Sequence, residues 1–274
     1  MEDKKKVRSI IHMGDIHIRT YRLHAEYNEL FDSLYVKLID YMEDFEYDEV
    51  RIVIAGDLVH QKITISNEQL MLCCHFLNIL SKIAPVVIIA GNHDLLENNK
   101  DRMDSISPII QLLDNDNISY LKESICYPDN NIVWCNYSIF EENARPDIES
   151  GRLKYGDKTY VGLFHGPLIG AKTDIGYEFE HGTALEHFDG CDMVLLGDIH
   201  KIQEFNYRGI PIKFSGSLIQ QNFGETVSKH GYTVWDVATR TNVDYELESD
   251  YGFYHFKITS VDDVQNNNEK LINE

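Results

Sequence analysis

Short apolar runs recur along the chain, and several of them end directly in polar residues. Residues 86–90 read Val-Val-Ile-Ile-Ala and lead into Gly91-Asn92-His93-Asp94. An unbroken apolar run of this length is typical of a parallel strand that is buried on both faces. In open α/β sheets, ligands bind beyond the carboxyl ends of such strands, because helices cover the faces. The polar residues therefore predict a functional site at this strand end.

Four other apolar or β-rich runs end in the same way. They cover residues 7–13, 50–55, 160–164 and 193–196. The polar side chains that follow them are, in chain order, Asp15 and His17, Asp57, His165, and Asp198 and His200. Because parallel strands present their carboxyl ends at one edge of a sheet, we expect these groups to lie close together.

Helices are predicted between the first strands, at about residues 24–43, 66–83 and 104–114. The first carries apolar side chains on one face at three- and four-residue spacing, which we assign to the core: Tyr27, Leu30, Phe31, Leu34, Leu38 and Tyr41. Strands alternating with helices predict parallel strands with right-handed connections.

The helix at 66–83 has two further features. Ser66 and Gln69 have the spacing of a capping box at its start. Its apolar residues, between Leu70 and Leu77, cover more than one face. Such a surplus is typical either of deep burial or of a subunit interface, and the pattern alone favours neither.

From residue 118 onward the pattern changes to short strands. Beyond the runs already named, they are predicted at 132–137, 204–207, 210–214, 232–237, 243–247 and 253–258. The later ones alternate apolar and polar residues, which is typical of antiparallel strands. A segment at 166–188, rich in Gly, Asp, Glu and Thr, could form a rim over a site, but a solvated connection is the default expectation.

Composition limits the possible functions. The chain has 274 residues, of which 43% are hydrophobic, enough for one large domain with or without a small appendage. It carries 25 Lys and Arg against 45 Asp and Glu, a net charge of −20. Phosphate neutralisation needs clustered Lys and Arg, so this charge argues against a surface that grips nucleic acid unaided.

The cysteines and the first residues bear on cellular location. Five cysteines without any Cys-x-x-Cys pair indicate reduced, mostly buried thiols. Residues 1–6 are charged and are followed only by a short apolar strand, so we expect neither a signal peptide nor a membrane span. The expected location is cytoplasmic or nucleoid-associated, not secreted.

The strand-end residues offer oxygen and imidazole ligands and no thiolate. This donor set favours Mn²⁺, Fe²⁺, Mg²⁺ or Zn²⁺ over Cu⁺ or an iron–sulfur cluster. The residues suffice for two ions, with Asp57 as a bridge between them. One ion would be held by Asp15, His17 and His200, and the other by Asn92, His165 and Asp198. Two ions roughly 4 Å apart can clamp a phosphate for in-line displacement.

Each motif alone has a simpler explanation. A Gly-Asp pair after a strand is commonly a turn and a helix cap, and Asn-His-Asp can form an Asx turn. Five such motifs, each directly after a buried strand, are not expected by chance. We therefore interpret them as parts of one site.

These motifs resemble those of the calcineurin-like metallophosphoesterases. The matching residues are Gly14-Asp15-x-His17, Gly56-Asp57, Gly91 to Asp94, His165-Gly166 and Gly197-x-x-His200. Within that superfamily, the chain is most similar to the DNA-repair nucleases typified by bacterial SbcD, its counterpart Mre-eleven, and phage recombination endonuclease subunits. This similarity rests on residues 57–60, 91–94, 197–201 and 214–218, continuing to Phe223-Gly224-Glu225, and it covers about residues 7–260.

The resemblance implies a fold and a domain organisation. The fold class would be α/β, a four-layer α+β sandwich of two mixed sheets flanked by helices, with a β-rich C-terminal half. Residues 1–260 would form the metallophosphoesterase (nuclease) domain. Residues 261–274 would be a polar tail or the start of a truncated capping domain.

The resemblance also assigns roles to side chains. The metal ligands are those proposed above, whereas His93 would face the scissile phosphate and assist the leaving oxygen or stabilise developing charge. His60 matches a second histidine near the substrate phosphate; a strand-end histidine hydrogen-bonded to a neighbour is an equal alternative. We expect Asp94 to orient its neighbours and Gly91 to allow a sharp turn.

One position departs from the pattern of the nucleases, which usually carry His where this chain has Asp198. A carboxylate still binds divalent ions, but it adds negative charge to a site that must attract phosphate. We therefore expect Asp198 to favour harder ions such as Mn²⁺ or Mg²⁺ and to weaken substrate attraction slightly.

By resemblance, the leading hypothesis is a phosphodiesterase that acts on DNA with two divalent ions, Mn²⁺ first and Mg²⁺, Fe²⁺ or Zn²⁺ as alternatives. It would be the nuclease subunit of an SbcCD/Mre-eleven-like recombination or repair complex. Its partner would be an SbcC-type coiled-coil ATPase. The helices at about 66–83 and 104–114 would form a homodimer, which favours the interface interpretation of the apolar surplus.

Two other functions compete with this hypothesis. The runner-up is a small-molecule or nucleotide phosphodiesterase or phosphatase of the same superfamily. Protein phosphatases carry Asp-Arg-Gly where Val59-His60-Gln61 stands here, which disfavours a Ser/Thr phosphatase. A catalytically inactive scaffold is disfavoured, because every ligand position is filled by a residue able to serve.

Overall fold

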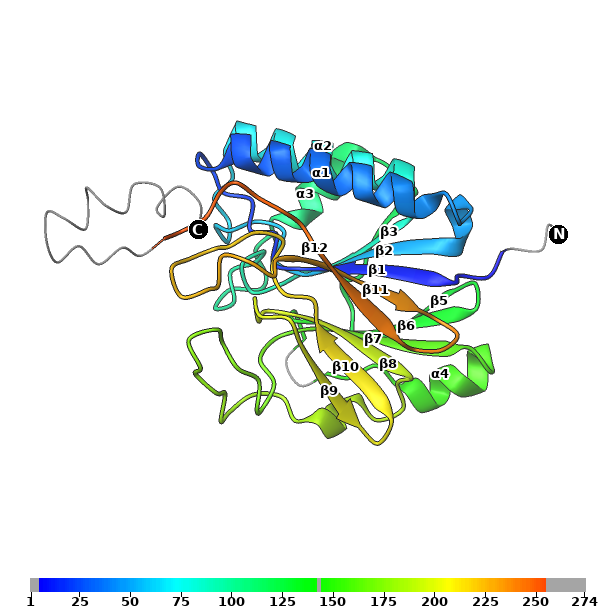
Figure 1. Cartoon of the computed structure of the whole chain (residues 1–274). Coiled ribbons are helices and arrows are strands. Elements are labelled where there is room, and N and C mark those ends of the chain that lie inside the picture. Colours follow the sequence, from blue (N-terminus) through cyan, green and yellow to red (C-terminus); the bar gives the residue numbers. More distant parts are fainter. Residues whose placement is uncertain (1–4, 142–143, 255–274) are drawn as a thin grey trace, which may run out of the picture.

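Two six-stranded sheets lie face to face in the computed structural model, which describes residues 5–141 and 144–254 (Figure 1). The strand order is β12-β11-β1-β2-β3-β4 in the first sheet and β5-β6-β7-β8-β10-β9 in the second. The first sheet contains β1 (Ser9–Met13), β2 (Val50–Ala55), β3 (Val86–Ile89), β4 (Ile118–Tyr120), β11 (Gly231–Asp236) and β12 (Asn242–Glu246). The second contains β5 (Cys126–Asp129), β6 (Ile132–Tyr137), β7 (Thr159–His165), β8 (Met193–Gly197), β9 (Gln203–Tyr207) and β10 (Ile210–Phe214).

Both sheets are mixed. Strands β1 to β4 run parallel to their neighbours, as the alternation of strands and helices predicts, and β11 and β12 are added antiparallel to them. In the second sheet β6, β7 and β8 are parallel, whereas β5 and β9 are antiparallel edge strands. Strand β10 pairs antiparallel with β9 but parallel with β8, so the antiparallel expectation for 210–214 holds on only one side.

Helices cover the outer face of the first sheet and part of the second (Figure 1). Helices α1 (His24–Met42), α2 (Asn67–Ile83) and α3 (Ile106–Leu113) pack on the first sheet, and α4 (Ile148–Tyr155) lies against the second. The α1–α2 contact is centred on Phe31 and Phe76, whose rings stack with centroids 4.1 Å apart. The predicted aromatic stripe is core, with Tyr41 half-buried at its end.

A second core fills the space between the two sheets. Its buried side chains come from both, among them Ile10 and Trp235 of the first sheet and Trp134 and Leu163 of the second. The central strands of each sheet therefore bury both faces, which explains why apolar residues predominate in them. The result is the expected four-layer architecture of helices, sheet, sheet and helix.

Some elements differ from the expectations. Helix α4 was not predicted, because its sequence has no apolar stripe and contains Gly151, which packs against Cys126. The available signal is Asp147, whose carboxylate accepts the backbone N–H of Ser150 at the helix start. Strands β4 and β5 were also missed; each has at most four residues. The predicted strand at 253–258 is wrong at residues 253–254, which are not strand, and its remainder lies outside the described residues.

Helix α2 begins as predicted but with half of a capping box. The Ser66 hydroxyl accepts the backbone N–H of Gln69 at 3.1 Å. The Gln69 side chain donates instead to the carbonyl oxygen of Ile18, tying the helix to the segment after β1. Most of the apolar surplus of the helix is buried within this chain, and Met71, which is 67% exposed, is the one large hydrophobic side chain of α2 that is exposed.

A buried histidine links the two sheets. His12 of β1 is fully buried and its Nε2 lies 3.1 Å from the carbonyl oxygen of Leu196 in β8, while its Nδ1 has no partner among the described residues. Burial, opposed by the hydrogen bond to Leu196 and assisted by the charge of Lys213, lowers the pKa of His12 from 6.5 to about 3. The folded chain therefore keeps this imidazole neutral where the unfolded chain protonates it.

We predict that stability falls as the pH drops below about 6.5, because only the unfolded state then takes up a proton at His12. Between pH 7.5 and 5.5 this group alone should cost about 1.4 kcal/mol. Urea unfolding with EDTA present, compared between the wild type and His12→Gln, isolates the contribution. Equal losses in the two proteins would show that His12 is not the cause.

Candidate metal centre

Five strand ends meet at one edge of the paired sheets. The segments after β1 and β2 remain side by side, since the backbone N–H of His17 donates to the carbonyl oxygen of Asp57 at 2.9 Å. The end of β8 closes on β1 from the second sheet, where the backbone N–H of Asp198 donates to the Asp15 carboxylate at 3.1 Å. A Cβ at Gly197 would overlap the carbonyl oxygen of Ala55, so glycine is required for this approach.

Four of the predicted ligands have a strained backbone. Asp15, His17 and Asp57 have φ values of 52°, 53° and 55°, and Asp198 has φ 102°. Non-glycine residues rarely adopt positive φ, and such conformations cluster at functional sites.

Asp15, His17 and His200, the first group of predicted ligands, lie close together. His17 Nε2 lies 3.1 Å from His200 Nε2, and the latter is 3.9 Å from Asp15 Oδ1. Together these three residues offer one donor atom each within 4.8 Å of one another. His200 Nδ1 donates to Glu225 Oε1 at 2.7 Å, which leaves its Nε2 facing the cluster.

The second group lies next to it. His165 Nε2 is 3.1 Å from Asn92 Oδ1 and 3.8 Å from Asp198 Oδ1. His165 Nδ1 donates to the carbonyl oxygen of Ala55 at 2.8 Å. This bond keeps a proton on Nδ1 and points Nε2 at the carboxylates.

Asp57 lies between the two groups. Its Oδ2 is 3.4 Å from His17 Nε2, and its Oδ1 is 3.5 Å from His165 Nε2. Oδ1 also accepts the backbone N–H of His93 at 2.8 Å. Its two oxygens thus face one group each, which is the arrangement that a bridging ligand needs.

Asp94 organises the backbone around Asp57. Its buried carboxylate accepts the N–H groups of Asp57 and Gly91 at 2.8 Å and that of Val59 at 3.1 Å. Gly91 is required for a reason other than the one expected: its φ is not positive, but a Cβ there would overlap Asp57 Oδ1 and lie 2.6 Å from His165 Cε1. The glycine allows close packing of the ligands rather than a sharp turn.

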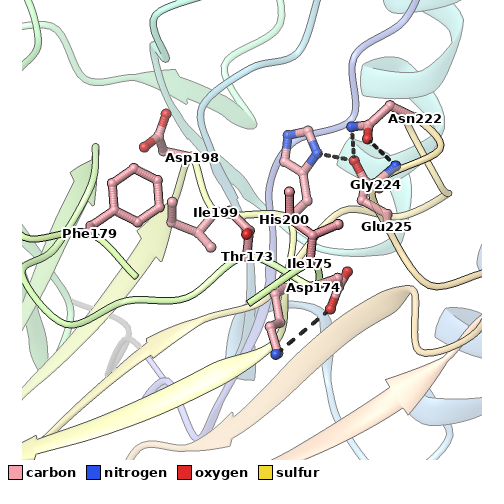
Figure 2. A pocket seen from close by; sticks show the side chains of 11 residues that line it. Thr173, Asp174, Ile175, Phe179, Asp198, Ile199, His200, Asn222, Gly224 and Glu225 are labelled. Atoms are coloured by element: carbon pink, nitrogen blue, oxygen red, sulfur yellow. Dashed lines mark hydrogen bonds and ion pairs between the residues drawn. The ribbon is translucent and has the colours of Figure 1, made fainter. Parts of the chain in front are cut away.

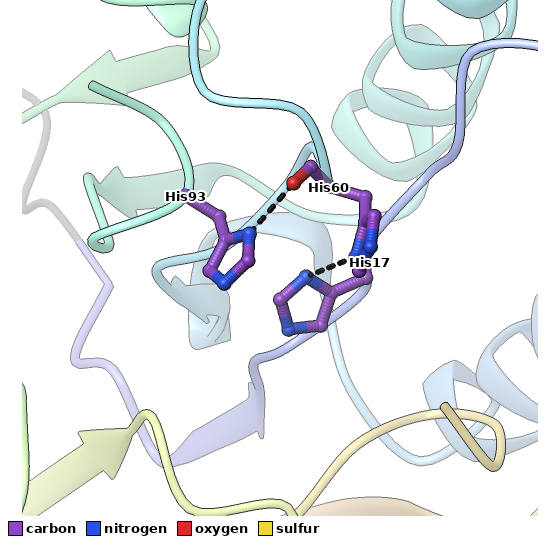
Figure 3. Close-up of side chains that lie close together, drawn as sticks. All are labelled: His17, His60 and His93. Atoms are coloured by element: carbon purple, nitrogen blue, oxygen red, sulfur yellow. Dashed lines mark hydrogen bonds between the residues drawn. The ribbon is translucent and has the colours of Figure 1, made fainter. Parts of the chain in front are cut away.

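His60 and His93 lie beside His17 (Figure 3). His93 Nδ1 donates to the carbonyl oxygen of His60 at 2.6 Å, and His60 Nδ1 lies 3.4 Å from His17 Nδ1. These three imidazoles could also bind a single ion. Since His93 Nδ1 is occupied by a carbonyl oxygen, its Nε2 is the nitrogen left for a ligand or a substrate.

Burial and neighbouring charges shift the pKa values of the three carboxylates in different directions. It raises the pKa of Asp15 to about 7 and also raises that of Asp198, even though neighbouring histidines oppose both shifts. The pKa of Asp57 is shifted downward instead. Burial alone would raise it, but the charges of His165 and His17 and a hydrogen bond from His165 lower it below its usual range. The three carboxylates of one small buried cluster therefore differ in the direction of their pKa shifts.

The pKa values of the histidines are also shifted in both directions. Burial lowers the pKa of His17 well below its usual value, and burial followed by the charge of Arg19 lowers that of His60 to about 4. Burial alone would also lower the pKa values of His200 and His165. The hydrogen bond to Glu225 nevertheless raises the pKa of His200 to about 9, and the charge of Asp57 raises that of His165.

This donor set fits divalent cations. The side-chain donors are carboxylate, amide and imidazole atoms aimed at one another, and two imidazole nitrogens face each other at 3.1 Å. Buried acceptors arranged in this way need positive charge between them, which protons or metal ions supply. Asp15, His17, Asp57 and His200 would hold one ion, and Asp57, Asn92, His165 and Asp198 a second.

A cavity of about 320 Å³ opens beside the cluster (Figure 2). Its walls include Asp198, His200 and Glu225, together with Ile175 and Phe179 from the segment at 166–188. That segment is therefore a rim beside the site, and the default expectation of a simple solvated connection is wrong.

The chain belongs to the calcineurin-like phosphoesterase family, whose model matches residues 8–202. Members of this family hydrolyse phosphoesters at a dinuclear divalent metal site, and the described residues contain His and Asp groups able to bind such ions.

Two curated proteins are similar along nearly the whole chain. Uncharacterized protein R555 of Acanthamoeba polyphaga mimivirus is 38% identical in an alignment of 264 residues, which covers 94% of this chain and 19% of that protein. The chain thus spans about a fifth of the length of this relative. The SbcD subunit of the SbcCD nuclease of Staphylococcus epidermidis is 24% identical over 96% of this chain and 82% of that protein.

Among solved structures, GAP50, described as the anchor in the inner membrane complex of Plasmodium, aligns with a TM-score of 0.49 and 9% identity, over 89% of this chain and 90% of that chain. This likeness is too distant to inform function. In the part of the chain that the structure describes, no helix combines the length and apolar character needed to cross a membrane.

One residue at the centre had no predicted role. Glu225 accepts the His200 Nδ1 proton and the backbone N–H of Gln221, so it orients a predicted ligand. Its signal in the sequence is its place in Phe223-Gly224-Glu225, one of the stretches that carry the family resemblance.

Proposed function

We propose that this chain is a two-metal-dependent phosphodiesterase that acts on DNA, as the nuclease subunit of an SbcCD/Mre-eleven-like recombination or repair complex. The observation that carries the proposal is the placement of Asp57, with one carboxylate oxygen toward His17 and the other toward His165. Divalent ions held by Asp57 and the residues around it would supply Lewis-acid chemistry at a phosphoester.

The chain's own residues then have separate tasks. Glu225 and the carbonyl oxygen of Ala55 hold His200 and His165 in the tautomers that leave Nε2 free. Asp94 holds the turn that carries His93. His93 Nε2 is the group that donates a proton to, or hydrogen-bonds with, the leaving oxygen.

The similarity to the staphylococcal SbcD subunit, which spans 82% of that protein, supports both DNA as the substrate and a partner subunit. A net charge of −20 opposes unaided DNA binding, so the proposal includes an SbcC-type coiled-coil ATPase that supplies basic surface. Mn²⁺ is the proposed metal, because oxygen ligands and imidazoles are present without thiolates.

A second candidate, a small-molecule or nucleotide phosphodiesterase, is favoured by one observation. The cavity beside Asp198 and His200 has a volume of about 320 Å³ and an apolar wall at Ile175, Ile199 and Phe179. This matches the size range of small-ligand sites, which begins at about 300 Å³.

Cleavage assays separate the two candidates. The purified chain is incubated with Mn²⁺ and, in parallel, with linear duplex DNA, single-stranded DNA and bis(p-nitrophenyl) phosphate. The proposal predicts metal-dependent shortening of at least one DNA substrate. Hydrolysis of the small ester alone would favour the second candidate.

Asp198 should set the metal preference. We predict that Asp198→His changes the ratio of Mn²⁺-supported to Zn²⁺-supported activity by about tenfold in favour of Zn²⁺, because imidazole is a softer ligand than carboxylate. The KM for DNA should fall slightly, since a negative charge is removed. Unchanged metal preference and unchanged activity would contradict the role given to Asp198.

Homodimerisation through α2 and α3 is also proposed. Large apolar side chains are exposed on these helices and just before α3: Met71 and Met103 are both 67% exposed, and Leu112 is 66% exposed. Exposed apolar side chains on adjacent helices are typical of interfaces. Light scattering at high concentration should give twice the mass of the chain, and a monomer would count against the interface.

A further inference from the structure

A guanidinium beside the metal centre has no carboxylate partner among residues 5–141 and 144–254. Arg19 is half-buried and lies two residues beyond His17. Its Nη2 donates to the backbone oxygen and the side-chain oxygen of Gln221, at 3.0 and 3.2 Å. Its Nε is buried without a partner among these residues. Other arginines form ion pairs with carboxylates, namely Arg8, Arg51, Arg152, Arg208 and Arg240.

Contact with water accounts for the other arginines that lack an ion pair, but not for Arg19. Arg22, Arg102 and Arg145 also form no ion pair with the described residues, but all three are exposed to water. A half-buried cation without a counter-charge is unfavourable, and this chain has 45 acidic residues from which a partner could have come. An unsatisfied guanidinium of this kind is suited to an anion that arrives from outside.

Arg19 lies at the border of the metal centre. Gln221, which accepts from Arg19, donates its backbone N–H to Glu225 Oε2 at 2.8 Å, and Glu225 Oε1 accepts from His200 Nδ1. One short segment therefore positions both Arg19 and a predicted metal ligand. The positive charge of Arg19 also acts on His60, whose pKa it lowers.

Aromatic rings lie next to the same segment. Phe223 is 62% exposed and packs edge-on against Phe253, with centroids 4.9 Å apart. Phe253 in turn meets Tyr251 at 5.4 Å, and Tyr251 lies within the electrostatic influence of Arg19. Rings of this kind beside a cation are the usual elements of a single-strand binding site, where bases stack and phosphates bind.

We propose that Arg19 and Phe223 form a subsite for the nucleotide adjacent to the scissile phosphate. Arg19 binds the neighbouring phosphate and Phe223 stacks on an unpaired base. The inference rests on the proposed action on DNA and refines it, because a stacked base must be free of its complementary strand. The substrate class is therefore a DNA strand with at least one unpaired nucleotide at the cleavage point.

The test compares a substrate with neighbouring phosphates and one without. Cleavage of a decathymidylate oligonucleotide and of bis(p-nitrophenyl) phosphate is measured with Mn²⁺ over a range of salt concentrations. Arg19→Ala should lower kcat/KM for the oligonucleotide about tenfold more than for the small ester, and should reduce the salt slope of log kcat/KM by about 1. Arg19→Lys should restore the slope. Phe223→Leu should lower kcat/KM for the oligonucleotide and leave the slope unchanged.

Arg22→Ala is the matched control, since it removes the same charge from an exposed position three residues away. Equal losses on both substrates in Arg19→Ala would overturn the subsite and show that Arg19 acts through Gln221 and Glu225 on His200. An unchanged Arg19→Ala variant would overturn it as well. A wild type that hydrolyses only the small ester would instead contradict the proposed action on DNA, and the subsite with it.

Discussion

Replacement of His93 by Ala should lower kcat by about 10²–10⁴-fold, the usual contribution of a positioned acid or base. Metal binding should persist, because His93 Nδ1 is bonded to the carbonyl oxygen of His60 and the ring is not needed in either ligand group. The measurement is Mn²⁺-dependent cleavage together with titration calorimetry of Mn²⁺ binding.

The control is His75→Ala, which removes an exposed histidine from the surface of α2. It should retain both activity and metal binding. Unchanged cleavage in His93→Ala would end the proposed role of this side chain. Loss of an ion in that variant would show that the imidazoles of His17, His60 and His93 bind metal together.

Asp57→Asn should be the most damaging single change. It keeps the shape of the side chain but removes the charge between His17 and His165, and it places an amide donor next to one of those imidazoles or the N–H of His93. Activity should fall by about 10³-fold or more, because both ions lose a ligand and the site loses negative charge.

Calorimetry should show fewer than two Mn²⁺ ions bound to Asp57→Asn, with the far-ultraviolet circular dichroism unchanged. Asp32→Asn, on the exposed face of α1, removes the same charge without touching the centre. A variant that still binds two ions with wild-type affinity would show that Asp57 is not a bridge.

The hydrophobic pattern predicts the fold well where burial is complete. Strands β1, β2 and β3 are buried on both faces, so each appears as a mainly apolar run with clear ends, interrupted only by Ser9 and His12 in β1 and by Arg51 in β2. Helix α4 and strand β5 have few buried residues and no such signal. Their formation depends on tertiary contacts, such as Gly151 against Cys126, which no local pattern contains.

The candidate site could likewise be predicted only in part from the sequence. The sequence identifies which side chains follow each strand, and the sheet topology brings them together. It does not reveal that Glu225 orients His200, since these residues are 25 positions apart and meet only through a loop. Nor does it reveal that Gly91 is needed for the close approach of Asp57 and His165, a property of packing across two sheets.

The most direct test is anomalous diffraction from crystals of the chain soaked in Mn²⁺. Two peaks are predicted, one on each side of the Asp57 carboxylate, the first near Asp15, His17 and His200 and the second near Asn92, His165 and Asp198. Their separation should be about 3.5–4 Å, as in other two-metal phosphoesterase sites. A single peak, or two peaks that do not share Asp57, would contradict the account.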